Sequence, residues 1–113
     1  MIAMKLNELA DRLSLTHVCG GLDKEASGVY AGDLLSWVMS HARAGDVWVT
    51  IMSNINVTAV ASLTEAACVI LAEGVQPDAA TLQAAVEKDV TIFSDSRSVY
   101  QLCCCLGTIL SDG

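Results

Sequence analysis

Polar side chains that could bind a ligand are grouped in four short segments, each of which follows an apolar stretch of the chain. Carboxylates, amides and hydroxyls can together offer hydrogen-bond donors and acceptors to one small molecule. If the apolar stretches are parallel strands, all four segments lie at the carboxyl edge of one sheet, where α/β proteins bind ligands. The sequence therefore predicts a site for a small metabolite or nucleotide that contains Asp33, Ser53, Asn54, Asn56, Glu73, Gly74, Ser94 and Asp95.

Helix capping competes with ligand binding at these positions, because Asp, Asn and Ser are the preferred N-caps of helices in any protein. We expect Asp33 and Ser96 to act as caps. Asn54 and Asn56 place two amides in one turn, which is more than one cap needs, so a site role and a structural role both stay open. Glu73 precedes a glycine, where a carboxylate is not an expected cap, and it is the strongest polar candidate.

Catalytic signatures are missing from the sequence. It contains no Gly-x-x-x-x-Gly-Lys-Ser/Thr phosphate loop, no Gly-x-Gly-x-x-Gly, no Gly-x-Ser-x-Gly and no His-Glu-x-x-His. Without phosphate-binding glycines and their lysine, the charge on a transferring phosphoryl group would not be stabilised. We therefore predict no catalytic residues and a protein that is not an enzyme.

The five cysteines and two histidines do not predict a metal site. His17 and His41 lack metal-ligand spacing to each other or to a cysteine, and we expect His41 at the surface. The run Cys103-Cys104-Cys105 falls in an expected helix, where successive side chains diverge by about 100° and cannot converge on one ion. We predict no metal and no cofactor, and reduced thiols, because an odd cysteine count does not indicate a disulfide framework.

Composition and charge limit the classes of partner. The 113 residues are 53% hydrophobic with a single proline, which is typical of one densely packed domain over residues 1–113. The net charge of −7 and the scattered lysines and arginines argue against a nucleic acid polymer as partner. No apolar run is long enough to span a membrane, and the start of the chain lacks the pattern of a signal peptide, so we expect a soluble, cytoplasmic protein.

Residue patterns predict alternating helices and strands. The spacing of apolar residues indicates helices over residues 5–13, 33–45, 54–63, 77–89 and 96–110, with Asp78 in the first turn of the helix that Pro77 opens. Apolar and β-branched runs indicate strands over residues 16–19, 28–31, 47–52, 67–72 and 90–93, with a polar loop over 23–27. Strict alternation with short links favours right-handed crossovers, and so an α/β fold with a mainly parallel sheet and helices on both faces.

The helix over residues 33–45 is apolar almost all round. One face of such a helix packs on its own domain, while another can pack against a second chain. We expect Trp37 to lie at an interface and the protein to form a homodimer.

The segment 67–78, ACVILAEGVQPD, resembles the central motif of DRTGG domains. The segments GDVWVT (45–50), DVTIFS (89–94) and YAGDLLSWVM (30–39) fit the same framework, so the resemblance spans essentially the whole chain. It implies a fold similar to the N-terminal domain of HPr serine kinase/phosphorylase. It also implies a regulatory or oligomerising role, as in the accessory domains of phosphate acetyltransferases and nucleotide-regulated pyrophosphatases.

The stand-alone members of this family occur in anaerobic bacteria, often encoded beside iron-only hydrogenase components, and some are named serine kinases. The resemblance therefore implies three hypotheses: a ligand-sensing regulatory module, an accessory partner of hydrogenase or redox-enzyme machinery, and a serine kinase, whose phosphate loop this sequence lacks. One departure matters, because Ala72-Glu73-Gly74 stands where the family name implies Thr-Gly-Gly. A carboxylate at this turn favours a cationic or hydroxyl-rich ligand over a phosphate-type ligand.

Overall fold

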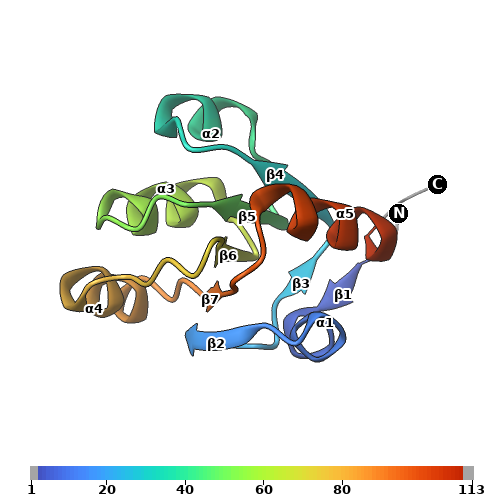
Figure 1. Cartoon of the computed structure of the whole chain (residues 1–113). Coiled ribbons are helices and arrows are strands. Elements are labelled where there is room, and N and C mark those ends of the chain that lie inside the picture. Colours follow the sequence, from blue (N-terminus) through green and yellow to red (C-terminus); the bar gives the residue numbers. More distant parts are fainter. Residues whose placement is uncertain (1–2, 111–113) are drawn as a thin grey trace.

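The structure is a computed structural model that describes residues 3–110. Its centre is a five-stranded sheet with the order β2-β7-β6-β5-β4 (Figure 1). The four strands from β7 to β4 are parallel, and β2 pairs with β7 in the antiparallel direction. The strands are β2 (Thr16–Cys19), β4 (Gly28–Ala31), β5 (Asp46–Thr50), β6 (Cys68–Leu71) and β7 (Ile92–Ser94).

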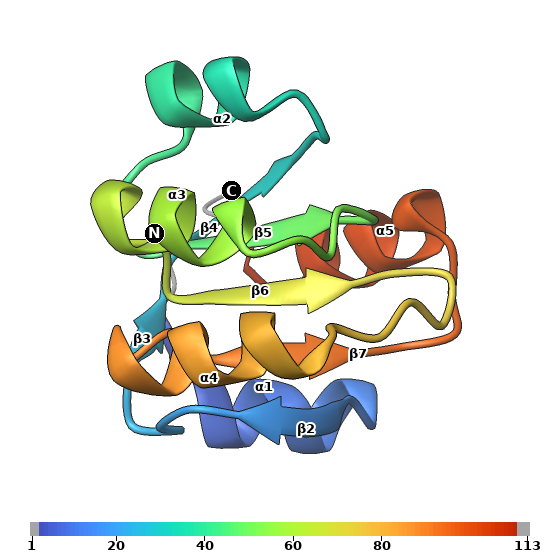
Figure 2. The same ribbon diagram turned by 90° about the vertical axis from the view of Figure 1, so that its left-hand side faces the viewer.

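Within the described residues, five helices cover the two faces of the sheet, which confirms the predicted mainly parallel α/β fold with helices on both faces. The helices α2, α3 and α4 lie on one face, and α1 and α5 lie on the other (Figures 1 and 2). None of the helices in the described part of the chain is long and apolar enough to cross a membrane. The helices are α1 (Leu6–Leu13), α2 (Leu35–His41), α3 (Asn56–Thr64), α4 (Ala79–Glu87) and α5 (Val99–Ile109).

The core has two layers because the central strands are apolar on both faces, as parallel sheets require. Every residue of β5 is buried, and its alternate side chains enter different layers. Val47 and Val49 pack with Phe93 under α1 and α5. Trp48, which is fully buried, packs on the opposite face under α2, α3 and α4.

The starts of α4 and α5 differ from the prediction. The helix α4 begins after Pro77, and Asp78 is its N-cap, where the carboxylate accepts a 2.8 Å hydrogen bond from the Thr81 N–H. The helix α5 is capped by Ser98 and not by Ser96, and a capping box completes its first turn. At α4, Pro77 stands before the cap and not in the first helical position that proline often takes. At α5, several Asp and Ser residues lie within a few positions, and only the local backbone selects the capping residue.

A small second sheet lies where the sequence predicted a polar loop. The strand β3 (Glu25–Ala26) lies in that segment and pairs antiparallel with β1 (Met4–Lys5), of which the pattern assigned Lys5 to the first helix. Ala26 is fully buried in the core. Two-residue strands are too short to show any periodicity, so the pattern contains no signal for them.

The turn after β2 depends on a glycine. Gly20 has φ +93°, and a Cβ at this position would lie 2.4 Å from the Thr91 Cα. Only glycine combines this backbone conformation with such a close approach of two chains. The predicted Gly20-Gly21 stop is therefore the point where β2 packs against the segment that leads into β7.

Candidate functional site

The four predicted segments lie at one edge of the sheet. The strands β4 to β7 run in the same direction, so the loops that follow them all leave from their carboxyl ends, at the right-hand side of Figure 2. Hydrogen bonds connect these loops to one another and to the strand ends. The predicted residues therefore share an edge, and their contacts decide which of them a ligand could reach.

Asp33 connects the loop after β4 to the end of β5. Its Oδ1 accepts hydrogen bonds from the Thr50 hydroxyl at 2.7 Å and from the Ile51 N–H at 3.1 Å. The expected role of Asp33 as N-cap of the next helix is wrong, because the cap position belongs to Leu34 and no side chain caps it. The Asp33 carboxylate instead fixes a fully buried threonine, which makes it a structural link at this edge.

In the loop after β5 and the start of α3, some polar groups form hydrogen bonds within the protein and others face solvent. The Ser53 carbonyl accepts a 3.1 Å bond from the Thr81 hydroxyl of α4. The Asn54 side chain accepts a 3.0 Å bond from the Asn56 N–H and so satisfies the first turn of α3. Asn56 is exposed at the first position of that helix, and Ile55 beside it is 50% exposed. An amide next to apolar surface is therefore open to solvent here.

The turn after β6 has an unusual backbone. Glu73 and Gly74 have φ values of +60° and +74°. Their N–H groups point to the neighbouring loop, where they donate to the Arg97 carbonyl at 2.9 Å and the Asp95 carbonyl at 2.8 Å. A left-handed conformation is uncommon for a glutamate, and here these two bonds hold it. The Glu73 residue itself is exposed.

Ser94 is not placed to contact a ligand. It is buried, its hydroxyl donates to the Val75 carbonyl at 3.1 Å, and it accepts a 2.9 Å bond from the Gln76 side chain. Since both hydrogen-bonding directions of the hydroxyl are used, Ser94 serves to hold the loop after β6.

Asp95 also has a structural partner, which the sequence prediction missed. Its two carboxylate oxygens receive hydrogen bonds from Arg97 Nε and Nη2, both at 2.7 Å, and Arg97 Nη2 also donates to the Leu13 carbonyl at the end of α1. The guanidinium lowers the pKa of the Asp95 carboxyl through these hydrogen bonds. The only sequence signal is the i, i+2 spacing of an acid and an arginine, which is common on surfaces.

Four of the predicted polar residues are exposed, namely Asp33, Asn54, Asn56 and Glu73. Asp33 and Asn54 each use a side-chain oxygen in hydrogen bonds within the protein, so Asn56 and Glu73 are the best contacts for a ligand. Asn56 begins α3, Glu73 lies in the loop after β6, and Ile51 and Ile55 of the loop after β5 are 45% and 50% exposed. Amide, carboxylate and apolar groups at one edge can bind a molecule that has hydroxyls and a flat or apolar part. They offer no activated nucleophile and no paired acid and base.

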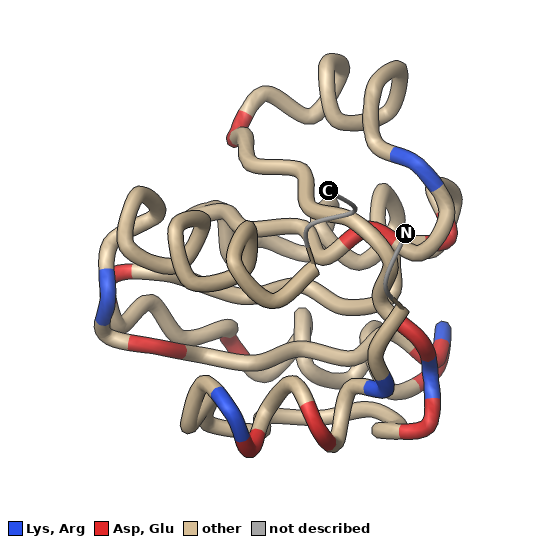
Figure 3. The backbone as a smooth tube through the Cα atoms, turned by 90° about the vertical axis from the view of Figure 1, so that its right-hand side faces the viewer, with Lys and Arg blue, Asp and Glu red and all other residues tan. Residues whose placement is uncertain are grey.

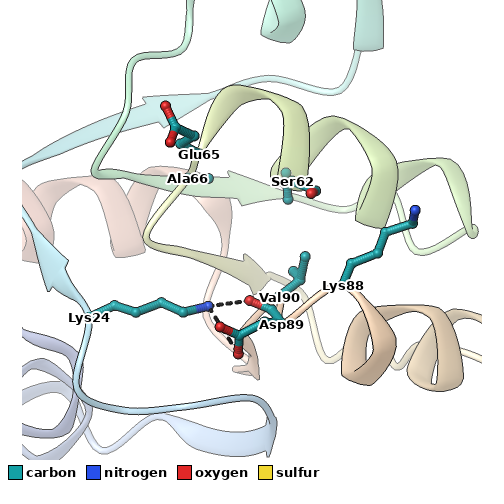
Figure 4. A pocket seen from close by; sticks show the side chains of 8 residues that line it. Lys24, Ser62, Glu65, Ala66, Lys88, Asp89 and Val90 are labelled. Atoms are coloured by element: carbon teal, nitrogen blue, oxygen red, sulfur yellow. Dashed lines mark hydrogen bonds and ion pairs between the residues drawn. The ribbon is translucent and has the colours of Figure 1, made fainter.

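A pocket of about 340 Å³ lies at the opposite, amino edge of the sheet. The residues Lys24, Ser62, Glu65, Lys88 and Asp89 are among those that line it (Figure 4). Lys24 Nζ donates to the Asp89 carbonyl and lies 3.8 Å from its carboxylate, whereas Lys88 points away from Lys24. A cation near the carbonyl end of a helix stabilises that helix. We therefore interpret Lys24 as a residue that stabilises the end of α4.

The cysteines do not converge. On α5, Cys104 is exposed, while Cys103 and Cys105 are half-buried, so the predicted place of Cys103 in the buried stripe is only partly right. Burial raises the pKa of the Cys68 thiol to about 12. Among the described residues, no group of three His, Cys, Asp or Glu side chains could hold a metal ion.

The fold defines the class of this protein as a three-layer α/β domain with a mainly parallel sheet. No family model and no curated protein matches the chain. A solved structure does: the CBS and DRTGG domains of the regulatory region of Clostridium perfringens pyrophosphatase, in complex with its activator diadenosine tetraphosphate. The TM-score is 0.63 at 14% identity, and the match covers 86% of this chain and 43% of that one.

This likeness shows the fold, and it supports the predicted similarity to DRTGG-type domains at the level of architecture. This chain spans less than half the length of the matched structure. Similarity to the HPr kinase N-terminal domain stays a prediction.

Proposed function

We propose that this chain is a non-catalytic regulatory module, one domain that acts as a homodimer and binds a small metabolite or nucleotide at the carboxyl edge of its sheet. One observation carries the proposal: hydrogen bonds cross-link the loops of this edge, which also contains the exposed residues Asn56 and Glu73 and the exposed apolar side chains of Ile51 and Ile55. A preformed edge of this kind binds without a large ordering cost. The shared fold with a regulatory region that binds a nucleotide activator supports the same function.

The chemistry of the edge favours the nucleoside part of a nucleotide over its phosphates. A carboxylate such as Glu73 can accept hydrogen bonds from ribose hydroxyls, as acidic residues do in dinucleotide-binding folds. The Asn56 amide can pair with a base edge, and Ile51 and Ile55 offer apolar contact to its face. The first N–H groups of α3 are already bonded to the Asn54 side chain and to preceding carbonyls, so they are not available to a phosphate.

Contacts at this edge also support a non-catalytic role. Asp95 binds Arg97 through both of its carboxylate oxygens, and its side chain is only 8% exposed. A general base needs a carboxylate that can reach a substrate proton. The serine-kinase hypothesis would further need a phosphate-binding loop, which the sequence lacks.

Isothermal titration with adenosine, AMP, ATP and diadenosine tetraphosphate tests the proposal. We expect Asn56→Ala and Glu73→Gln each to weaken binding of the adenosine part about tenfold, or roughly 1.4 kcal/mol. Glu87→Gln is the matched control, because it removes an exposed carboxylate from the end of α4. Binding that is absent up to about 1 mM for all four compounds, or unchanged in both site variants, would show that this is not a nucleotide site.

A second candidate function is supported by the surface of α2. Leu34, Trp37 and Met39 are 61%, 57% and 43% exposed, and such clustered apolar side chains mark protein interfaces. The alternative is an accessory factor for hydrogenase or redox-enzyme machinery that binds its partner through this helix. A partner identified by mass spectrometry that co-purifies with Glu73→Ala but not with Trp37→Ala would favour it, and the reverse pattern would exclude α2.

A further inference from the structure

The strand β4 has a free edge. It is the last strand in the sheet order, and within residues 3–110 no other strand pairs with its outer side. The Gly32 N–H donates inward to the Val49 carbonyl at 3.2 Å. Because the direction of backbone groups alternates along a strand, the N–H and C=O groups of Val29 and Ala31 point outward.

The two edges of the sheet are protected to different degrees. The opposite edge strand, β2, has a register shift between His17 and Cys19, and it lies beside α1 with its charged residues (Figures 1 and 2). Bulges and charges are the usual devices that keep edge strands from pairing with other chains. The strand β4 has a regular register with β5 and contains no charge and no proline, so it lacks these devices.

Charge is sparse in all three layers on the β4 side, where the exposed residues Asp33, between β4 and α2, and Arg43, after α2, carry the flanking charges. The segments 28–31, 34–42 and 98–110, which contain β4, α2 and α5, have no Asp, Glu, Lys or Arg, although the chain has 19 such residues. In Figure 3 the helices α2 and α5 are tan along their whole length, whereas α1 has several coloured segments. Ring stacking connects α2 to this edge. The centroid of the His41 ring lies 6.5 Å from that of Tyr30 in β4 and 4.8 Å from that of Trp37.

We propose that a second copy of this chain pairs with β4 in the antiparallel direction, so that the two sheets form one continuous ten-stranded sheet. The two α2 helices would then meet on one face and the two α5 helices on the other. The inference rests on the homodimer in the proposed function but not on its ligand.

The distribution of charge favours a second copy of this chain as the partner. Two molecules of net charge −7 repel each other, and the repulsion is weakest where a side with few charges faces its own equivalent. A cationic partner would instead bind the acidic surfaces elsewhere on the molecule. An antiparallel strand pair also satisfies a two-fold axis, in which the same residues of both copies face each other.

The helices are needed for a stable interface. A stable dimer buries about 800 Å² from each partner, and two strands of four residues supply only part of that area. Leu34, the N-cap of α2, and Trp37 and Met39 within α2 are exposed on one face of the sheet, and Tyr100 of α5 is exposed on the other, so they can add apolar area to the interface.

The oligomeric state of three proteins tests the inference by sedimentation velocity. We expect the wild type to be a dimer and Ala31→Lys to be a monomer, because the variant puts two like charges at the strand pair. Thr16→Lys is the matched control, since Thr16 is an exposed residue of the other edge strand, and this variant should stay dimeric. Circular dichroism and thermal unfolding show whether each variant is folded.

Amide hydrogen exchange of the wild type gives a second measurement that needs no variant. The amides of Val29 and Ala31 should exchange slowly in the dimer and at least about tenfold faster on dilution to monomer, while the Thr16 amide is unchanged. If Ala31→Lys is still a dimer and amide exchange in β4 does not depend on concentration, β4 is not the interface, although the protein is a homodimer. A wild type that is monomeric at all concentrations would overturn both, and nucleotide titrations would still test the ligand site separately.

Discussion

Replacing Arg97 with alanine should destabilise the protein far more than its partly exposed position suggests. The guanidinium makes two 2.7 Å bonds to Asp95 and another to the Leu13 carbonyl, so it joins the loop after β7 to the end of α1. Its side chain is 30% exposed, but that of Asp95 is only 8% exposed. The Arg97→Ala variant therefore leaves a nearly buried carboxylate without its counter-ion, which costs more than the loss of a surface pair.

We expect a loss of about 2 to 3 kcal/mol in the free energy of unfolding, after allowing for solvent screening of the exposed arginine. For a domain of this size that corresponds to a melting temperature roughly 10 °C lower. The matched control is Arg12→Ala, which removes an exposed pair with Glu8 and should cost no more than about 0.5 kcal/mol. Urea unfolding followed by circular dichroism measures both values.

The effect of Arg97→Ala should depend on pH with a definite sign. Because Arg97 lowers the pKa of the folded Asp95 carboxyl, the pair stabilises the protein above the unfolded pKa of about 3.9. That contribution is lost as the pH falls through the lower, folded pKa. The gap in stability between wild type and variant should therefore be full at pH 7 and shrink below about pH 4. Equal losses in Arg97→Ala and Arg12→Ala, or a gap that does not change with pH, would refute the reasoning.

Three further predictions concern the fold. Gly20→Ala should cost about 3 kcal/mol or more in urea unfolding, because its Cβ would lie 2.4 Å from the Thr91 Cα at a φ of +93°; a loss below about 1 kcal/mol would contradict the close approach. Ser98→Ala should lower the unfolding free energy by about 1 kcal/mol through loss of the α5 cap, and an unchanged value would argue against that cap. In native protein treated with a thiol reagent, mass spectrometry should find Cys104 modified quickly and Cys68 modified only on unfolding, because burial raises the Cys68 pKa to about 12.

The sequence predicted the elements whose patterns are long and regular. The buried strands β5 and β6 appear as continuous apolar runs, and the alternation of strands with helices was enough to predict the mainly parallel sheet. The pairing of β1 with β3 could not be predicted, because it joins two-residue segments about 20 residues apart and is held by burial of Ala26. Short non-local pairings leave no periodic trace in a sequence.

The candidate site was predicted at the level of an edge but not of individual contacts. A parallel topology brings the strand-end loops together whatever their side chains do, so their common location followed from the fold. Which polar groups face solvent depends on partners far away in sequence, such as Thr50 for Asp33 and Gln76 for Ser94. No residue type or spacing predicts such partners. Because of these hydrogen bonds, several predicted residues are not the best contacts for a ligand.

The antiparallel pair of β2 and β7 has a consequence for how the chain folds. These strands are separated by about 70 residues, so β2 can pair with β7 only after the ribosome has synthesised the strands β3 to β6. At a synthesis rate of about 5 to 20 residues per second, β2 waits several seconds on the ribosome without a pairing partner. Long-range pairings of this kind slow folding, because the entropy of closing the loop must be overcome first. Until β7 is available, the backbone groups of β2 have no strand partner and can pair with other chains.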